Sequence, residues 1–386
     1  MRILIIHDNL TMSALLTRLV SYLWPNALVI TTTDGRSGLD QWHNAGAHLV
    51  ILDWELPRLS GLEVLKIIKR TGGDVPCVML SKHLDRDSVM IAAAHHVDAF
   101  IAKPFLLQET IARLSALLPT THAELSPVSN CHTFNSFIAY SIAQATLGLP
   151  IASDLIKAIE QIRTLDTDSK TQLLRRSQHS PALMLRLLSF ANRPPYHLDT
   201  QPIEDFIEAF QHVGVDDFIN IALELSLIPG SVLKHHLLQQ KQAYFEQDHL
   251  RLTDIVTKMN QDVEFDLKAA RSTCQLYRVG ELTLLQLMQA WLDHGHLLDE
   301  VACDQLLQRN AAHLGNQIKT QWNLHGTIRN RIGAAYLLPS GTVRREQVIM
   351  RIAGLLCSGD KKNELPRLLS RVGLSETAAQ RYQISE

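Results

Sequence analysis

The chain has 386 residues, of which 46% are hydrophobic and 20% are charged, so it can form two or three domains and is too apolar to be disordered. Its formal net charge of −2 offers no basic excess for a nucleic-acid partner. No apolar stretch reaches the roughly 18 residues of a membrane-spanning helix, and five scattered cysteines without a CxxC motif are typical of a reducing compartment. We therefore expect a cytoplasmic protein with no membrane segment and no nucleic-acid partner.

Residues 1 to about 118 alternate short apolar runs with amphipathic helical patterns. The apolar runs predict strands at Ile3–Ile6, Leu28–Thr31, Leu49–Leu52, Cys77–Leu80 and Phe100–Ala102. The periodic segments between and after them predict helices at Met12–Leu23, Ser37–Ala45, Leu62–Arg70, Asp87–His95 and Leu107–Leu117. Strands that alternate with helices specify a five-stranded parallel α/β sheet of the flavodoxin-like type.

The character of the chain changes after residue 118. Residues 119–148 contain turn formers, with enough apolar residues around Phe134–Ala145 for a short helix, and we interpret them as a partly helical linker. From residue 149 to 386 strand signals disappear, which predicts an all-helical second domain. Its helical patterns lie at Ile151–Ile162, Ser169–Ser177, Ala182–Asn192, Ile203–Val213, Phe218–Leu227, Leu250–Met288, Asp299–Trp322, Thr327–Tyr336, Arg344–Leu356, Pro366–Val372 and Glu376–Tyr382.

Polar side chains follow four of the predicted strands directly. Asp8 comes after the first strand and Asp53 after the third, and these strands are neighbours in a sheet of this type. Two carboxylates that close repel each other unless a cation lies between them, and Mg²⁺ suits a site built from carboxylates and waters. Ser81 and Lys103, which end the fourth and fifth strands, would add a hydroxyl and an ammonium. Together these groups predict phosphoryl transfer to an aspartate.

In this arrangement the chain resembles the receiver domain of two-component response regulators, across residues 2 to about 118. The motifs that carry the resemblance are Asp8 in Ile5-Ile6-His7-Asp8-Asn9, Asp53 with Pro57 and Gly61, Ser81 after Val78-Met79-Leu80, and Lys103-Pro104-Phe105. Each motif alone is weakly specific, but all four in order at strand ends are strong.

The resemblance implies a role for each matching residue. Asp53 would accept a phosphoryl group from a sensor histidine kinase. Asp8 and the backbone carbonyl of Glu55 would bind Mg²⁺ together with Asp53. Ser81 and Phe100 match the hydroxyl and aromatic residues of the family's switch. The resemblance also implies a cis Lys103–Pro104 bond, because proline is the residue that makes this isomer accessible.

One position departs from the family pattern. The receiver family usually has two adjacent acids after the first strand, and here the first of them is His7. Imidazole suits Mg²⁺ poorly, so we expect His7 to weaken the metal site and count it only as a doubtful ligand. A pseudo-receiver that never carries phosphate is the alternative reading of this departure.

The second half contains many histidines but little that predicts a metal site. Adjacent residues on a helix point about 100° apart, so His235 and His236 would not share a metal ion. Segments there resemble the HDOD domain, an all-helical relative of HD-type metal phosphohydrolases that generally lacks their catalytic ligands. They are Leu149-Pro150, Ser180–Leu183, Arg186–Asn192 and Phe210–Gly214, within a match from Leu149 to about Leu356. Tyr277 and Arg278 stand where the relatives have a His-Asp pair, and arginine cannot bind a cation.

The sequence thus predicts a response regulator whose receiver domain switches a non-catalytic HDOD output domain. Phosphorylation of Asp53 would reshape the face formed by the fourth helix, the fifth strand and the fifth helix. The output domain would then contact a protein partner, or its own copy in a homodimer, and the chain would not be an enzyme. The rival hypotheses are a divergent HD-type metal phosphohydrolase acting on a cyclic nucleotide, and a nucleic-acid-binding output domain.

Overall fold

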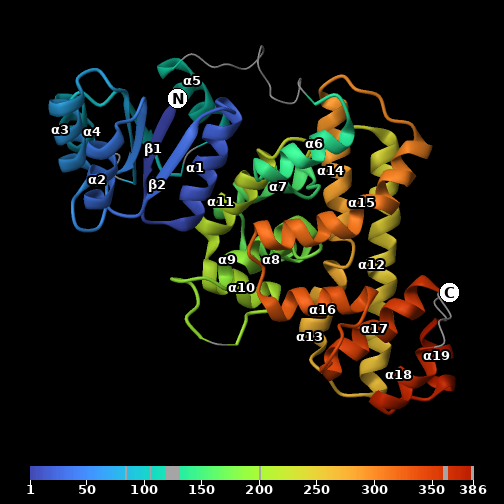
Figure 1. The fold of residues 1–386 in the computed structure, drawn as a ribbon. Coiled ribbons are helices and arrows are strands. Elements are labelled where there is room, and N and C mark those ends of the chain that lie inside the picture. The colour runs from blue at the N-terminus through green and yellow to red at the C-terminus, as the bar shows by residue number, and fades with distance from the viewer. Residues whose placement is uncertain (83–84, 105, 119–130, 200, 360–363, 384–386) are drawn as a thin grey trace. The chain divides into compact units, whose positions relative to one another are not determined.

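The computed structural model describes residues 1–386 except 83–84, 105, 119–130, 200, 360–363 and 384–386. The chain divides into two compact units, Met1–Cys131 and His132–Glu386, which are drawn in Figure 1. Most of the predicted linker before residue 131, and Phe105 of the Lys-Pro-Phe motif, lie outside the described residues.

The first unit is built on a parallel sheet, as predicted. Its strands follow the order β2-β1-β3-β4-β5, which puts β3 at the centre between β1 and β4. Every residue of β3 and β4 is buried, because helices cover both faces of the sheet. The strands are β1 (Arg2–Ile6), β2 (Leu28–Thr32), β3 (Leu49–Asp53), β4 (Cys77–Ser81) and β5 (Ala99–Ala102).

The helices of this unit begin at residues that cap them. Asn9 and Asp34 accept hydrogen bonds from the first turns of α1 and α2, and Ser60 forms a capping box with Glu63 at the start of α3. Asp85 caps α4 by accepting from the Ser88 N–H. The helices are α1 (Leu10–Leu23), α2 (Gly35–Ala45), α3 (Gly61–Gly72), α4 (Arg86–Ala94) and α5 (Leu107–Leu117).

The described residues of the second unit form helices and the loops that connect them, as predicted (Figure 1). Ser180 caps α9, and Gly214, with φ of 83°, ends α10. Its helices are α6 (Phe134–Ala143), α7 (Ser153–Glu160), the short 3₁₀ helix η2 (Ile162–Thr164), α8 (Thr167–Ser177), α9 (Pro181–Ala191), α10 (Phe206–Val213), α11 (Val215–Ser226), α12 (His236–Asp262), α13 (Leu267–Gln275), α14 (Val279–Asp293), α15 (Glu300–Gln321), α16 (Gly326–Tyr336), α17 (Arg345–Ser358), α18 (Leu365–Val372) and α19 (Glu376–Gln383).

The predicted helical pattern over Leu250–Met288 was wrong in its boundaries. The structure has three helices there, and the first of them, α12, already begins at His236. Val263 leaves α12 in an extended conformation, and the Asp266 side chain then caps α13 by accepting from the Ala269 N–H. The second break, between α13 and α14, is a turn at Leu276 and Arg278 without a side-chain cap. Neither break contains glycine or proline, so the apolar periodicity alone could not locate them.

Three helices of the second unit are almost completely buried. Every residue of α9 is buried, and so are nearly all of those in α14 and α17, which fits their apolar character on all sides. Helix α14 packs along α15 at a close crossing of Gly280 and Gly315, where a Cβ on Gly280 would lie 2.0 Å from the Ala311 carbonyl oxygen. Among the described helices, none is both long and apolar enough to cross a membrane.

One lysine of the second unit is buried. Lys319 on α15 is 7% exposed, and burial, together with the charge of nearby Arg329, lowers the pKa of Lys319 to about 8. Its ordinary pKa is about 10.4, so between these pH values the unfolded chain binds more protons than the native protein. The native state therefore gains stability as the pH rises through this window.

Replacing Lys319 with methionine is expected to remove this pH dependence. Relative to Lys319→Met, the native protein should gain about 3 kcal/mol between pH 7 and pH 10.5, because a shift of one pKa unit corresponds to about 1.4 kcal/mol. Urea unfolding of both proteins across this range measures the difference. The matched control is Lys268→Met, at an exposed position on α13. The free energy of unfolding of this control should differ from that of native protein by the same amount at every pH. If the difference for Lys319→Met is also the same at every pH, the prediction is contradicted.

Candidate functional site

The carboxyl ends of β1, β3, β4 and β5 lie together at one edge of the sheet. Asp53 is the last residue of β3 and is buried, while His7 and Asp8 follow β1 directly. Ser81 ends β4 with no exposed surface, and Lys103 follows β5. Because β1 and β4 flank β3, the sheet order brings groups that are far apart in the sequence to one place.

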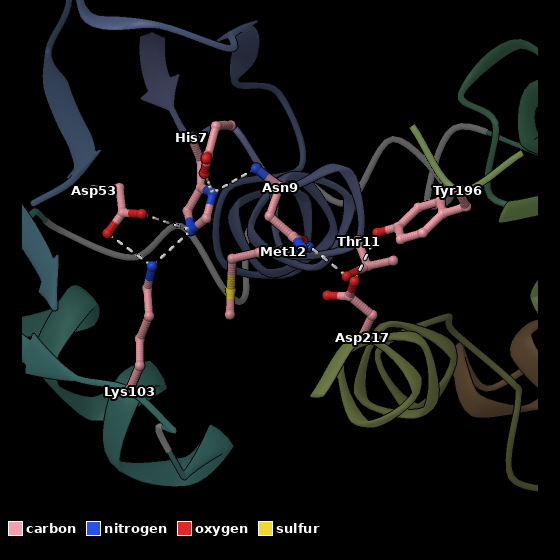
Figure 2. Close-up of polar contacts among 9 residues, drawn as sticks. His7, Asn9, Thr11, Met12, Asp53, Lys103, Tyr196 and Asp217 are labelled. Atoms are coloured by element: carbon pink, nitrogen blue, oxygen red, sulfur yellow. Dashed lines mark hydrogen bonds and ion pairs between the residues drawn. The ribbon is translucent and has the colours of Figure 1, made fainter. Parts of the chain in front are cut away.

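Asp53, Lys103 and His7 converge in this site (Figure 2). The Lys103 ammonium donates to Asp53 Oδ1 at 2.7 Å, and it lies 2.9 Å from His7 Nε2. His7 Nε2 is also 3.6 Å from Asp53 Oδ2, while His7 Nδ1 lies 3.3 Å from Asp8 Oδ1. The predicted meeting of Asp8, Asp53 and Lys103 is therefore present in the structure, with His7 at its centre.

His7 has more donors around it than a neutral imidazole can accept. The Asn9 N–H donates to His7 Nδ1 at 3.0 Å, and Lys103 faces Nε2 from the other side. A neutral ring carries one proton, so it accepts at only one of its two nitrogens. A proton on Nε2 faces the ammonium, and a proton on Nδ1 can bond Asp8 but faces the Asn9 N–H. In either neutral form a ring N–H therefore faces another donor, from Lys103 or from Asn9. A carboxylate at this position would accept from both donors.

Asp8 differs from Asp53 in its exposure. Its side chain is 50% exposed, whereas that of Asp53 is 9% exposed. The hydrogen-bonding contact with His7 lowers the pKa of Asp8 below its ordinary value, and this outweighs the effect of its partial burial. Asp8 is therefore an anion at neutral pH, open to solvent on one side.

The donor set of this site fits a hard divalent cation in part. His7, Asp8 and Asp53 each offer one ligand atom, and these atoms all lie within 4.8 Å of one another. Two carboxylates beside a solvent-facing opening suit Mg²⁺, which binds one or two carboxylates and keeps several waters. The imidazole of His7 is the poorer member of the set, because Mg²⁺ prefers oxygen.

The loop after Asp53 is held close to it by a glycine. A Cβ on Gly61 would lie 1.9 Å from the Asp53 carbonyl oxygen, and the Gly61 N–H donates to the Trp54 carbonyl at 3.0 Å. Glu55, whose carbonyl was predicted as a ligand, is an exposed residue in this same loop. Gly61 thus lets the first turn of α3 approach the end of β3 and shapes the floor of the site.

The two predicted switch residues lie on adjacent strands. Ser81 and Phe100 belong to β4 and β5, and the Lys103 N–H donates to the Ser81 carbonyl at 2.7 Å. Phe100 is half-buried and meets Trp54 edge to face, with ring centroids 6.2 Å apart. This contact, which joins the residue after Asp53 to the aromatic on β5, was not predicted from the sequence. The Lys103–Pro104 bond is cis, as expected.

In the second unit, Arg278 was expected from the sequence resemblance to replace the aspartate of a metal-binding pair. Its Nη1 donates to Glu281 Oε1 at 2.7 Å, and its Nη2 donates to Asp248 Oδ2 at 2.6 Å. Burial disfavours its charge, but Glu281 and other neighbours outweigh this and raise the pKa of Arg278. Arg278 also lies over the ring of Tyr277, 4.6 Å from its centroid. A permanent guanidinium cation thus lies between two carboxylates.

Asp248 was not identified from the sequence. It lies on α12, 30 residues before Arg278, and nothing local links the two positions. Among the described residues of His132–Glu386, no group of three or more His, Cys, Asp or Glu side chains lies close enough to hold a metal ion. His296 of this unit stacks on Trp291, with ring centroids 3.4 Å apart.

Two family models match the chain. The response regulator receiver domain matches residues 3–115 and the HDOD domain matches residues 149–337, so the second match ends before our expected limit near Leu356. The response regulator MprA of Mycobacterium sp. (strain KMS) is 36% identical over 136 residues, which cover 34% of this chain and 57% of that protein. MprA of Mycobacterium avium (strain 104) is 35% identical over 138 residues, covering 35% and 58%. The chain thus spans little more than half the length of these relatives.

Solved structures also resemble the first unit. The N-terminal domain of an uncharacterized Wolinella succinogenes protein is 25% identical, with a TM-score of 0.28, and the match covers 30% of this chain and 93% of that one. A Francisella response regulator receiver domain is 21% identical, with a TM-score of 0.27, and covers 30% and 94%.

The parallel sheet, its strand-end residues and the matching family model define the first unit as a receiver domain. Residues 3–115 of the chain thus match the response regulator receiver domain, and this match is followed by that of the HDOD domain at residues 149–337.

Proposed function

We propose that Asp53 accepts a phosphoryl group from a sensor histidine kinase in the presence of Mg²⁺, and that this controls a non-catalytic HDOD output domain. The observation that carries the proposal is the cluster of Asp53, Lys103 and Asp8 at one edge of the sheet. In this assignment residues 1–118 are the receiver, 119–148 a partly helical linker and 149–386 the output domain, which the matched ranges support. The protein would work in the cytoplasm, where histidine kinases phosphorylate their regulators.

The proposed transfer uses the residues of the site in distinct ways. An Asp53 carboxylate oxygen forms the new bond to phosphorus while the phosphorus–nitrogen bond of the kinase phosphohistidine breaks, and the released imidazole nitrogen keeps the electron pair. The Lys103 ammonium, 2.7 Å from Asp53, neutralises charge on the transferred group. Asp8 and Asp53, with the Glu55 carbonyl, would hold Mg²⁺, which when bound supplies further charge neutralisation.

The proposed switch follows from the charge that phosphorylation adds. The new phosphoryl oxygens would draw the buried Ser81 hydroxyl, and Phe100 would turn inward into the space this opens. Its ring would then leave its present edge contact with Trp54. The face formed by α4, β5 and α5 carries exposed apolar residues at which such a change could alter a protein contact, namely Val89, Met90, Ile91 and Leu106.

We further propose that the HDOD domain acts by contact with a protein partner or with a second copy of the chain, and that it is not an enzyme. The replacement of a metal-binding pair by Tyr277 and Arg278 supports this, because the Arg278 guanidinium fills the space between Asp248 and Glu281. The rival is a divergent HD-type phosphohydrolase acting on a cyclic nucleotide. Elemental analysis of the purified protein decides between them: stoichiometric iron, manganese or zinc in the helical unit would favour the enzyme.

The phosphoacceptor assignment is tested by treating the protein with acetyl phosphate and Mg²⁺. Native protein is expected to gain one hydroxylamine-sensitive acyl phosphate, detected by intact-protein mass spectrometry, and Asp53→Ala none. The matched control is Asp40→Asn, which removes an exposed carboxylate elsewhere in the same unit and should be phosphorylated like native protein. If native protein gains no acyl phosphate and shows no change with beryllofluoride, it is a pseudo-receiver and the proposal fails.

A further inference from the structure

A groove of about 520 Å³ lies between helices α12 and α15 of the second unit, above the start of α14. One face of α12 lines it with Leu237, Lys241 and Tyr244, which follow one another at helical spacing. The facing side of α15 contributes acidic and apolar residues, and Arg278 and Glu281 lie at the beginning of α14. Helix α14 packs against both other helices, so the groove is part of a single helical body.

The cations of this groove are already paired with carboxylates. All three guanidinium nitrogens of Arg278 donate to Asp248 or Glu281. The Lys241 ammonium donates to Asp304 at 2.6 Å and lies 3.9 Å from Glu300. The hydrogen bond to Asp304 also raises the pKa of Lys241, so the ion pair persists at neutral pH.

Carboxylates outnumber cations along the groove. Lys241 and Arg278 face three lining carboxylates, those of Glu281, Glu300 and Asp304, which leaves one net negative charge. The Glu300 and Asp304 side chains are 70% and 56% exposed, so an incoming cation can reach them from solvent. A phosphate-bearing ligand would meet paired cations and excess negative charge. The groove therefore favours a cationic partner and disfavours an anionic one.

Apolar groups lie beside these carboxylates. Tyr244 is 58% exposed and offers an aromatic surface, while Leu237 and the α15 residue Leu307 are half-buried along the walls. Val301 on α15, next to Glu300 in the sequence, is 66% exposed. A ligand that suits this surface carries a positive charge next to an apolar group.

We propose that this groove binds a basic amphipathic segment of a partner protein. An arginine or lysine of the segment would form ion pairs with Glu300 and Asp304, and its aliphatic stem would pack on Tyr244. Neighbouring apolar side chains of the segment would pack on Leu237 and Leu307. A groove between two helices suits a partner helix with one apolar face. The inference rests on the proposed output function of the HDOD domain and names the chemistry of its partner.

Replacing Lys241 tests this proposal by the direction in which the affinity for a cationic peptide changes. A cationic segment competes with Lys241 for Glu300 and Asp304, so removing the ammonium should strengthen its binding. The probe is a fluorescein-labelled 14-residue peptide with leucine and arginine at helical spacing, titrated with full-length protein in a fluorescence anisotropy assay. The Lys241→Met variant is expected to bind this peptide about fivefold more tightly, and the double variant Glu300→Gln, Asp304→Asn about fivefold more weakly, the scale of exposed ion pairs. Unchanged or weaker binding by Lys241→Met would overturn the proposal.

Three controls separate this site from other kinds of binding. Asp168→Asn removes an exposed carboxylate on α8 and should leave the affinity unchanged; an equal loss there would mean attraction to overall charge and overturn the proposal. A peptide with glutamate in place of arginine should not bind, and its binding would point to an anionic ligand instead. If benzamidine binds as tightly as the arginine peptide, the groove takes a small cation and is not a docking surface.

The same preparations distinguish failure of this inference from failure of the proposed function. The acyl phosphate on Asp53 is measured without any peptide, and the effects of the Lys241, Glu300 and Asp304 variants on peptide binding are measured without phosphorylation. If Asp53 is phosphorylated but the groove variants do not change peptide binding, only the docking inference fails. Circular dichroism of each variant measures whether the substitutions leave the helical unit folded.

Discussion

Replacing Arg278 with alanine is expected to lower the free energy of unfolding of the helical unit by about 3–5 kcal/mol. The change leaves Asp248 and Glu281 without the cation that bonds them, and their side chains are only 8% and 12% exposed. Two carboxylates held near each other in a poorly solvated place repel, and neither can recover its lost hydrogen bonds from solvent without moving. Urea denaturation followed by far-ultraviolet circular dichroism measures the loss.

A matched control for this variant is Arg163→Ala. Arg163 also bonds an aspartate with two nitrogens, but its side chain and that of Asp216 are 34% and 53% exposed. Solvent screens such a pair, so its removal should lower the stability by no more than about 1 kcal/mol. A loss of that size for Arg278→Ala would show that the guanidinium is not needed to hold the carboxylates.

A triple variant separates the ion network from the packing of the arginine stem. Combining Arg278→Met with Asp248→Asn and Glu281→Gln removes all three charges while keeping side chains of similar size. It should be more stable than Arg278→Ala alone, because no uncompensated carboxylate remains. A triple variant that is as unstable as the single one would assign the loss to packing.

The receiver site could be predicted because its residues follow strand ends. Asp8, Asp53, Ser81 and Lys103 each come directly after an apolar run, and a parallel sheet with β3 at its centre gathers the ends of such runs at one edge. Strand order and register determine which strand ends are neighbours. Local patterns were therefore enough to predict that residues up to 96 positions apart, such as His7 and Lys103, lie in one site. The fold of the first unit followed from the same alternation of strands and helices.

The side-chain contacts of the helical unit were harder to predict from the sequence, because they depend on how the helices pack. Arg278 was recognised as unable to bind a metal, but its partner Asp248 lies on a different helix with no local signal. The first turns of α12 were missed, and with them the face that carries Lys241 and Tyr244. A helix crossing is determined by side-chain shape over many residues, as at Gly280 and Gly315, and periodicity does not encode it.

Within the receiver site, the position of His7 could be predicted but its contacts could not. The sequence indicated a missing acid and hence a weaker metal site. It did not indicate that the imidazole lies 2.9 Å from the Lys103 ammonium, or that the Asn9 N–H donates to the same ring. These contacts surround a residue that stands where the family usually has an acid, and they indicate what restoring the acid would change.

The variant His7→Asp is expected to bind Mg²⁺ about tenfold more tightly than native protein, which corresponds to about 1.4 kcal/mol. A carboxylate adds an oxygen ligand and a negative charge to Asp8 and Asp53, and hard cations prefer both. It can also accept from the Asn9 N–H and from Lys103 together, which neither neutral form of the imidazole can do. Phosphorylation by acetyl phosphate should then reach half-completion at a correspondingly lower Mg²⁺ concentration.

The same variant should lose stability when Mg²⁺ is removed. Three carboxylates would then meet with Lys103 as the only cation among the described residues of the site, and their repulsion raises the free energy of the folded state. Thermal unfolding of native protein, His7→Asp and His7→Asn, each with Mg²⁺ and with chelator, measures both effects. His7→Asn is the matched control, because it offers an oxygen without the charge and should show a smaller Mg²⁺ dependence than His7→Asp. Equal Mg²⁺ dependence in all three proteins would mean that the residue at position 7 does not face the cation, and that Asp8 and Asp53 alone set its affinity.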